Sequence, residues 1–325
     1  MTPVRLREIV GAFAGARVLC VGDLMMDEYV WGRATRISPE SPVMVVEVDR
    51  ETSVPGGAAN VVHNLLALGA AVAVAGVVGD DAAGAALRAR LGEEGADVSG
   101  VLADPGRPTT RKTRVVAHHQ QVLRVDRERA APLQPEVRRR LEEEIEGLAR
   151  EADAIVVSDY DKGVVCASTA AVAVEAGRRR GAPVTANAKP RNAQRFAGAS
   201  LVSLNAAEAD AVAGASAFSA GEGLEEAGRA LREILGIDAL VVTRGADGIA
   251  LWEADGVCRR VPAHPVEVYD VAGAGDTVIS VLTLGLARSV HLVEAAEVAS
   301  LAAAAVVRKV GVAVVTAREL LGADG

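Results

Sequence analysis

Short apolar runs alternate with segments of helical periodicity over most of this sequence. The runs predict buried strands at residues 17–21, 71–77, 154–157, 183–186, 201–203 and 239–242. Helical periodicity predicts helices near residues 58–68, 81–94, 134–149, 167–179 and 222–234. This alternation favours an α/β fold with a doubly wound, mostly parallel sheet and helices on both faces. Residues 248–252 and 257–261 predict a hairpin at its edge.

Two segments, residues 27–55 and 109–127, depart from this pattern. They lack helical periodicity and alternate in polarity, which predicts amphipathic strands near 41–48, 110–117 and 121–125. We therefore expect one domain over residues 1–325 that carries a small inserted β-sheet as a lid. Such a sheet has one apolar face to cover, and we expect a second subunit to cover it. The candidate sets for that face are Met44, Val46 and Val48, or Val43 and Val45.

Composition narrows the function classes. The chain has 325 residues, half of them hydrophobic, which is enough for a large α/β core. Its net charge of −8 argues against a nucleic-acid partner. The three cysteines have neither metal-ligand nor disulfide-framework spacing, so we expect a reduced, cytoplasmic setting. No apolar run approaches the roughly 20 residues of a membrane span, so no membrane partner is expected.

The most informative stretch is the loop Asp270-Val-Ala-Gly-Ala-Gly-Asp-Thr277, which leads into an apolar helix. The small residues Gly273, Ala274 and Gly275 let an anion approach the backbone N–H groups and the positive end of the helix dipole. Asp276 lies beside that anion hole, where it can accept a proton from an attacking hydroxyl. A tight turn followed by a helix cap explains the same loop without any chemistry.

Polar residues follow several of the expected strands. Asp23 and Asp27 come after the first strand, where open α/β sheets bind ligands, and carboxylates suit sugar hydroxyls. Gly56 and Gly57 allow close backbone approach to a ligand, and Asn60 offers an amide that both donates and accepts. Turns and caps remain the alternative explanation for each of these residues.

Three further sites follow later strands. Asn205 and Glu208 share one face of a helical turn and suit a magnesium site, but the same spacing fits a capping box equally well. Thr243-Arg-Gly245 suits a nucleotide phosphate, and Lys189 is a cation for a ligand or for solvent. An ordinary surface loop explains both equally well.

Taken together, these motifs resemble the ribokinase-like (PfkB) family of carbohydrate kinases along nearly the whole chain. The motifs, in order, are Gly22-Asp23, Gly56-Gly-Ala-Ala-Asn60, Asn205-Ala-Ala-Glu208, Thr243-Arg-Gly245 and Gly273-Ala-Gly-Asp276. Within the family the chain is similar to the D-glycero-D-manno-heptose 7-phosphate kinases. The marks of that group are Arg36-Ile-Ser-Pro-Glu-Ser-Pro-Val43, Gln120-Gln-Val-Leu-Arg-Val-Asp126, Ser158-Asp-Tyr-Asp-Lys-Gly163 and Glu267-Val-Tyr-Asp270. Bifunctional relatives add a nucleotidyltransferase domain; this sequence ends at Gly325 and is expected to match the stand-alone kinase.

The resemblance implies transfer of the ATP γ-phosphoryl group to the anomeric hydroxyl of heptose 7-phosphate, giving the 1,7-bisphosphate of the ADP-heptose pathway. It makes Asp276 the base and Gly273, Ala274 and Gly275 the anion hole. It assigns nucleotide binding to Asn205, Thr243, Arg244, Gly245, Ala274, Gly275 and Ser300, and Mg²⁺ to Asn205 and Glu208. It assigns sugar binding to Asp23, Asp27, Gly56, Gly57 and Asn60. We expect the distal phosphate to meet Lys189 and at least one of the lid cations Lys112, Arg114 and Arg124, supported by Gln121. Asp126 is a further expected substrate-binding residue of the lid. A homodimer through the lid and a monovalent cation near Asp270 are also implied.

Several positions depart from the pattern of that group. Asn187-Ala-Lys189 stands where Asp-Pro-Lys is usual, and His118-His119 replaces an Arg-Asn pair in the lid. Ala272 replaces a usual Thr, and Ser300 stands where an Asn is frequent. These departures keep two alternatives open: a kinase for another sugar or sugar phosphate, and a catalytically silent sugar-phosphate sensor. The intact Asp276 argues against the sensor, because a pure binding protein needs no base.

Overall fold

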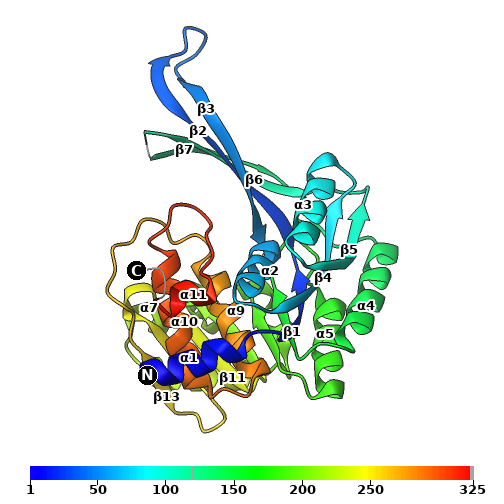
Figure 1. Ribbon diagram of the computed structural model, residues 1–325, viewed down its shortest axis with the longest axis vertical. Coiled ribbons are helices and arrows are strands. Elements are labelled where there is room, and N and C mark those ends of the chain that lie inside the picture. Colours follow the sequence, from blue (N-terminus) through cyan, green and yellow to red (C-terminus); the bar gives the residue numbers. More distant parts are fainter. Residues whose placement is uncertain (119, 323–325) are drawn as a thin grey trace.

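A nine-stranded sheet forms the centre of the computed structural model, which describes residues 1–118 and 120–322 (Figure 1). The strand order is β13-β12-β11-β10-β9-β8-β1-β4-β5. The strands that run parallel are β1 (Arg17–Gly22), β4 (Ala71–Gly79), β5 (Asp97–Asp104), β8 (Ala154–Ser158), β9 (Val184–Asn187), β10 (Leu201–Asn205) and β11 (Ala239–Thr243). The antiparallel pair β12 (Ile249–Trp252) and β13 (Cys258–Val261) closes one edge as the expected hairpin. The predicted α/β sheet is confirmed.

Helices cover both faces of this sheet. One face carries α1 (Pro3–Ala12), α2 (Ala58–Ala67), α3 (Ala82–Glu93), α9 (Ala274–Ala287), α10 (Leu292–Val306) and α11 (Ala317–Leu320). The other carries α4 (Pro135–Ala149), α5 (Ala167–Arg180), η1 (Pro190–Phe196), α6 (Ala206–Ala213), α7 (Ala217–Ala220) and α8 (Leu224–Leu235). Alternate residues of β1 point to the two faces: Val18 and Cys20 join one apolar cluster, and Leu19 and Val21 the other. Among the described residues, no helix is long and apolar enough to span a membrane.

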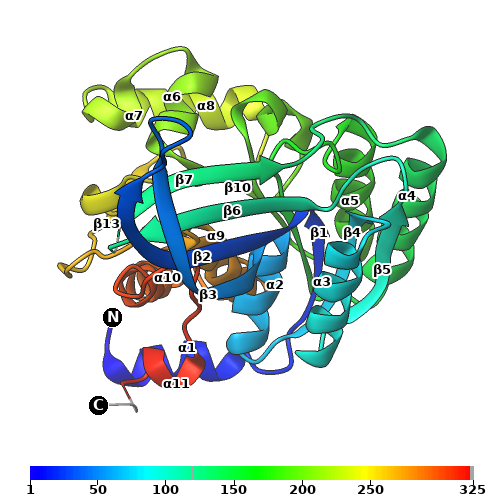
Figure 2. The same ribbon diagram turned by 90° about the horizontal axis from the view of Figure 1, so that it is seen from above.

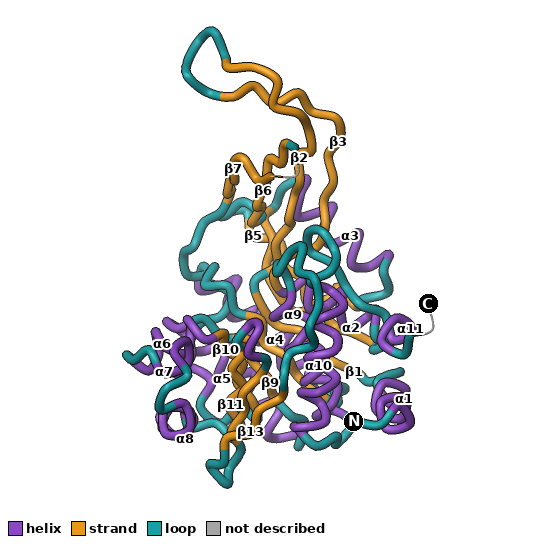
Figure 3. Tube along the Cα trace, turned by 90° about the vertical axis from the view of Figure 1, so that its left-hand side faces the viewer, coloured by secondary structure: helices purple, strands orange, loops and turns teal. Residues whose placement is uncertain are grey.

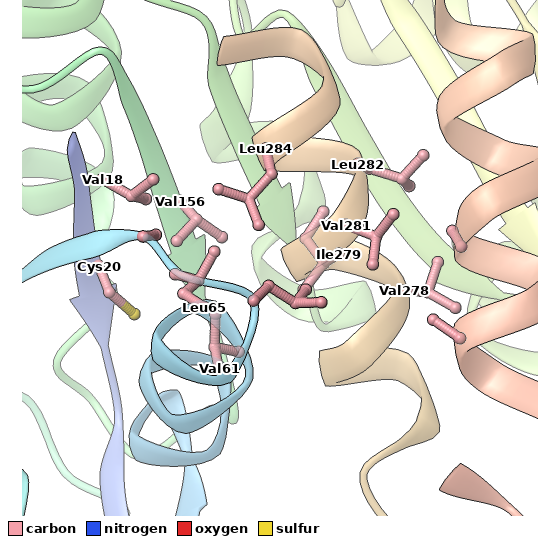
Figure 4. Packing of buried hydrophobic residues seen from close by; sticks show 14 of the residues in the cluster. Val18, Cys20, Val61, Leu65, Val156, Val278, Ile279, Val281, Leu282 and Leu284 are labelled. Carbon is pink, nitrogen blue, oxygen red and sulfur yellow. The ribbon is translucent and has the colours of Figure 1, made fainter. Parts of the chain in front are cut away.

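Helix α9 lies in the middle of one face, between α2 and α10 (Figure 4). Its apolar side chains pack against Val61 and Leu65 of α2 and against the sheet. Its buried hydroxyl groups are paired as well: Thr283 is 2.6 Å from the Thr185 hydroxyl, and Ser280 donates to the Asp276 carbonyl at 2.7 Å. A helix held on every side fixes the position of its first turn, which lies at the carboxyl ends of the parallel strands.

The inserted sheet, our name for the second sheet, stands off the body in the order β3-β2-β6-β7 (Figures 2 and 3). Its strands are β2 (Leu24–Ile37), β3 (Met44–Gly57), β6 (Thr110–Ala117) and β7 (Gln120–Arg127). The expected amphipathic strands are present as β3, β6 and β7. Strand β2 was not predicted as a separate strand; it begins three residues before the predicted insertion 27–55 and pairs with β6 in parallel. Residue 119, named above as part of the His118-His119 pair, lies outside the described residues.

The two faces of the inserted sheet differ in character. Register places Asp27, Tyr29, Lys112 and Arg114 on one side, which we call the inner face because it is turned toward the body. The opposite, outer face carries Val48, Leu123 and Val125, which are 53%, 55% and 38% exposed. Val43 and Met44, from both predicted sets, are 56% exposed each. The chain by itself does not bury this apolar surface.

Strand β5 was missing from the sequence-based expectations. Asp97, Ser99 and Gly100 interrupt its apolar run, so no period-2 or continuous pattern stands out. The strand forms because β4 supplies parallel pairing partners for six of its eight residues, with one irregularity near its start. Pairing across the sheet decided this element, and a single-sequence pattern does not record such pairing.

Two helical glycines give a test of this packing. A Cβ on Gly228 of α8 would lie 2.0 Å from the Trp252 ring, whereas a Cβ on Gly147 of α4 would meet nothing within 4 Å. We expect Gly228→Ala to destabilise the protein by about 1–3 kcal/mol, because the ring fills that space. Gly147→Ala should be neutral or stabilising by up to about 1 kcal/mol. Chemical denaturation measures both; equal effects of the two variants would contradict this packing.

Candidate active site

The carboxyl ends of β1 and β8 and the first turn of α9 meet at one point, the buried carboxylate of Asp276. Its side chain accepts two hydrogen bonds, one per oxygen: Asn60 Nδ2 donates to Oδ2 at 2.7 Å, and the Tyr160 hydroxyl donates to Oδ1 at 2.6 Å. Burial raises the pKa of Asp276 to about 6, although both donors lower it. A carboxyl group with this pKa is mostly ionised at pH 7 and close enough to its pKa to take up a proton.

The loop before α9 allows this arrangement because residue 273 is a glycine. Gly273 is the N-cap residue, with φ of 80°, and a Cβ there would lie 2.8 Å from Asn60 Nδ2. The first N–H groups of a helix have no partner within it, so those of Gly275 and Asp276 are suited to an anion. Asn60 is itself held, because Asn64 Nδ2 donates to its carbonyl at 2.8 Å and the Thr277 hydroxyl donates to Asn64 Oδ1 at 2.8 Å.

Asp23 is 1% exposed and is occupied by the backbone of the loop after β8. Its carboxylate accepts from the N–H groups of Tyr160, Lys162 and Val164 at 2.8, 3.1 and 3.1 Å. Burial raises the pKa of Asp23 to about 6 against these donors. These bonds show that Asp23 holds the backbone of the loop after β8. They do not test the predicted contact of Asp23 with the sugar.

Asp159, absent from the sequence-based candidates, holds the same loop from its other side. It is 1% exposed and accepts from the N–H groups of Asp161 and Lys189 at 2.8 and 3.0 Å and from Asn192 Nδ2 at 2.9 Å. Asp159 follows the end of β8 just as Asp23 follows the end of β1. The same signal, a polar residue directly after a predicted strand, could therefore have identified it. Tyr160, next to it, was part of a quoted motif but was given no role.

Tyr160 lies between two lysines. Lys112 Nζ is 5.7 Å and Lys189 Nζ 5.3 Å from the centre of its ring, within the range of cation–π attraction. Lys112 comes from the inner face of the inserted sheet, and burial lowers its pKa. Within residues 1–118 and 120–322, Lys112 makes no ion pair. A partly buried, unpaired ammonium group beside a proton acceptor is suited to an anionic ligand.

Lys189, by contrast, has a partner. Its Nζ lies 2.5 Å from Glu208 Oε1, and Glu208 Oε2 accepts from the Asn205 N–H at 2.9 Å. Asn205 Oδ1 accepts from the Glu208 N–H at 2.8 Å, which completes a capping box at the start of α6. Both alternatives for this motif remain compatible, because each oxygen of Glu208 and Asn205 Oδ1 accepts one hydrogen bond and keeps a second lone pair.

The remaining predicted lid residues fall into two groups. Asp27 pairs with Arg114 on the inner face. A Cβ on residue 56 would lie 2.1 Å from Asp27 Oδ2, so this position requires glycine. Arg124 and Asp126 pair with each other on β7 at 2.9 Å, and Gln121 is exposed on the same strand. Arg124 and Gln121 thus lie on β7, the edge strand of the inserted sheet, where Arg124 is the cross-strand partner of Arg114 on β6.

A pocket of about 490 Å³ opens beside the first turn of α9. Its lining includes Thr243, Gly245, His264, Ala274, Gly275 and Ser300, with valines and alanines between them. This size and apolar lining suit a nucleobase and its ribose. The Ser300 hydroxyl donates to the Pro262 carbonyl at 2.9 Å. Arg244 is turned away, because its Nε donates to the Phe218 carbonyl at 2.9 Å.

Asp270, the expected neighbour of a monovalent cation, joins two loops. It accepts from the N–H groups of Ala272 and Gly311 at 2.9 and 3.1 Å. Among the described residues there is no cluster of three or more His, Cys, Asp or Glu side chains that could hold a metal. Mg²⁺ does not require one, since it keeps several waters and is bound through one or two carboxylates and substrate phosphates. Glu208 with Asn205 fits that requirement.

The comparisons with known proteins agree with this geometry. Residues 16–318 match the family model described as pfkB family carbohydrate kinase. The chain is 41% identical over 318 residues to the bifunctional protein HldE of Pelobacter propionicus, covering 98% of this chain and 65% of that protein. It is 43% identical over 326 residues to HldE of Geobacter metallireducens, with 98% and 66% covered. The chain therefore spans just under two-thirds of the length of these relatives.

Solved structures show the same fold. Phosphofructokinase-2 from Escherichia coli, in complex with substrates and products, superposes with a TM-score of 0.77 at 19% identity, over 95% of this chain and 99% of that one. Ribokinase from Arabidopsis thaliana, complexed with ribose and ATP, gives 0.72 at 19% identity over the same shares. The ribokinase-like fold implied by the motifs is confirmed. The match of the family model over nearly the whole sequence places the chain in the pfkB family of ATP-dependent carbohydrate kinases.

Proposed function

We propose that this kinase transfers the γ-phosphoryl group of ATP to the anomeric hydroxyl of D-glycero-D-manno-heptose 7-phosphate, giving the 1,7-bisphosphate. The observation that carries the proposal is the buried Asp276 carboxylate in the first turn of α9, which accepts hydrogen bonds from Asn60 and from Tyr160. The ring of Tyr160 in turn contacts Lys112, which is unpaired among the described residues. The heptose is supported by the motifs of that subgroup and by 41–43% identity to proteins named HldE. We propose a cytoplasmic setting for the reaction.

In this reaction Asp276 accepts the proton of the sugar hydroxyl, and the hydroxyl oxygen forms a bond to the γ-phosphorus. The bond from that phosphorus to the bridging oxygen breaks, and ADP leaves with the electron pair. N–H groups of the Gly273–Gly275 loop and the first turn of α9 stabilise the charge that develops on the transferring group. Closure of the inserted sheet would exclude water, which otherwise takes the phosphoryl group.

The nucleotide belongs in the pocket lined by Thr243, Gly245, Gly275 and Ser300. Asn205 and Glu208 would hold the water shell of a Mg²⁺ ion, which when bound neutralises phosphate charge. Lys189, which pairs with Glu208 and contacts the Tyr160 ring, would lie near the phosphates of ATP. A monovalent cation near Asp270 is supported by the phosphofructokinase-2 structure in complex with potassium.

We assign the distal phosphate of the sugar chiefly to Lys112. Lys189 was the first candidate from the sequence, but its ammonium group is already paired with Glu208. Lys112 is unpaired within the described part of the chain, whereas its neighbours Lys162 and Arg124 are paired with Glu128 and Asp126. Burial lowers the pKa of Lys112, and Asp27 raises it. An unpaired, partly buried ammonium group on the lid is what a phosphate far from the reacting hydroxyl requires in an acidic protein.

A kinase for a different sugar or sugar phosphate is the second candidate. Asn187 and Ala188 replace an acidic residue and a proline beside Lys189, and His118 is bonded to the Ala34 carbonyl at 3.1 Å. His118 therefore lies near the turn of the inserted sheet, with an exposed side chain. A silent sensor is less well supported, because the buried, twice-bonded Asp276 is suited to proton transfer.

We also propose that the outer face of the inserted sheet joins two copies of the chain. Its exposed side chains Val48, Leu123 and Val125 form an apolar surface on a sheet too thin to bury it alone. Phosphofructokinase-2 of Escherichia coli has a tetrameric inhibited form, so association occurs within this fold.

The role of Asp276 is tested by Asp276→Asn. We expect turnover to fall by about 10²–10⁴-fold, because the amide cannot accept the proton, while ATP affinity is nearly unchanged. Steady-state kinetics and nucleotide titration measure the two quantities. Asp97→Asn, a matched change on the edge strand β5, should leave both unchanged. If the Asp276 variant retains more than about a tenth of the turnover, Asp276 is not the base.

The phosphate assignment is tested by comparing Lys112→Ala with Lys189→Ala. Hydrogen bonds to charged groups contribute roughly 1.5–3 kcal/mol, so Lys112→Ala should raise the KM for the sugar phosphate about tenfold or more without changing that for ATP. Lys189→Ala should mainly lower kcat. The unphosphorylated sugar should be a poor substrate of the parent enzyme; efficient turnover of it would favour the second candidate function.

The dimer is tested by Leu123→Lys combined with Val48→Lys. Two charges on the outer face should convert the protein to a monomer at micromolar concentration, as measured by sedimentation or solution scattering. Ile234→Lys is the control, since Ile234 is 65% exposed on α8, outside the inserted sheet. A parent protein that is already monomeric at these concentrations excludes this interface.

A further inference from the structure

The mechanism above does not use the hydroxyl of Tyr160, although it donates to Asp276 Oδ1 at 2.6 Å. We propose that Tyr160 is a positioning residue whose hydroxyl orients the Asp276 carboxylate and keeps it ionised near neutral pH, ready to accept the proton of the sugar. This inference rests on the proposed function, in which Asp276 is the base.

The geometry of the carboxylate is the first argument. Asn60 holds Oδ2 at 2.7 Å and Tyr160 holds Oδ1, so rotation of the carboxylate breaks both hydrogen bonds. A carboxylate oxygen has two lone pairs, and each oxygen of Asp276 therefore retains one for the hydroxyl of the substrate. Tyr160 can remain in place while Asp276 accepts the proton.

The second argument is the rigidity of the tyrosine. Asp23 accepts from its N–H at 2.8 Å and from the N–H groups of Lys162 and Val164 beyond it. Asp159 accepts from the N–H of Asp161 at 2.8 Å, where φ is +55°, a conformation that is rare for a residue other than glycine. Two buried carboxylates thus fix the backbone on both sides of Tyr160, and its ring lies between two ammonium groups.

The charges around Asp276 make this donor important. Burial, together with Asp27 on β2, raises the pKa of Asp276, while Tyr160, Asn60 and Lys189 lower it. Cys20 on β1 also lies within electrostatic range, and burial raises its pKa so far that the thiol stays neutral. Burial and Asp276 raise the pKa of Tyr160 well above 10, so the phenol remains a donor throughout the working range, with Glu208 acting in the same direction.

The test is the pH profile of Tyr160→Phe. Without the hydroxyl, the pKa of Asp276 should rise above its present value of about 6. The base must be ionised, so the acid limb of kcat/KM should move to higher pH by at least about one unit, with about tenfold less activity below pH 6. Most of the activity should return at pH 8.5, and the KM for ATP should be unchanged.

Tyr29→Phe is the matched control. Its hydroxyl accepts from the Val312 N–H at 3.3 Å and does not touch Asp276, so its acid limb should stay with that of the parent. An unmoved limb in Tyr160→Phe, or a loss of activity that is uniform across pH, overturns the proposal. Asp276→Asn separates the two claims, because if that variant is active Asp276 is not the base, and the part of the proposed function on which this inference rests fails whatever the profile of Tyr160→Phe.

A second variant keeps the proposal testable if Tyr160→Phe folds poorly. The sequence has three tyrosines, so fluorotyrosine incorporated into a Tyr29→Phe, Tyr269→Phe background labels only Tyr160. The more acidic phenol is a stronger donor of nearly the same size, and it should move the acid limb to lower pH. A limb that moves to higher pH, or not at all, contradicts the assignment.

Discussion

Burial of the Asp276 carboxylate is the constraint on which the rest of the site depends. A buried charge without partners is costly enough that the group takes up a proton instead. Asn60 and Tyr160 prevent this by donating to one oxygen each. Asn60 is held by Asn64 of α2, and the backbone of Tyr160 is held by Asp23, which follows β1. The two donors therefore keep the Asp276 carboxylate ionised until it accepts the proton of the substrate. The surrounding core holds both donors in position.

The sequence predicted the fold because the local patterns and the long-range structure agree. Strand β1, the hairpin β12–β13 and helix α9 each carry a clear signal, and the ends of parallel strands must meet at one edge. Strand β5 was not predicted, because polar residues at its start interrupt its apolar run. The glycine loop and Asp276 were found for a related reason: close approach to an anion requires small residues at fixed positions along the chain.

The sequence did not indicate which site residues form ion pairs or hydrogen bonds with one another. Nothing in the local pattern indicates that Lys189 pairs with Glu208, that Asp27 pairs with Arg114, or that Asp23 is occupied by three N–H groups. Each of these contacts joins residues distant along the chain, and each changes which groups are left for a ligand. Lys112 became informative only when the structure left it without a partner among the described residues.

The path of the chain at the base of the inserted sheet has a mechanical meaning. Strand β2 begins at Leu24, directly after Asp23, and β3 ends at Gly57, three residues before Asn60. The two strands of the long hairpin are thus rooted in the residues that hold the Tyr160 loop and the Asp276 carboxylate. A tilt of the hairpin about this root turns both anchors together. A displacement of the hairpin at its base would therefore shift Asp23 and Asn60, and with them the two hydrogen bonds that Asp276 accepts.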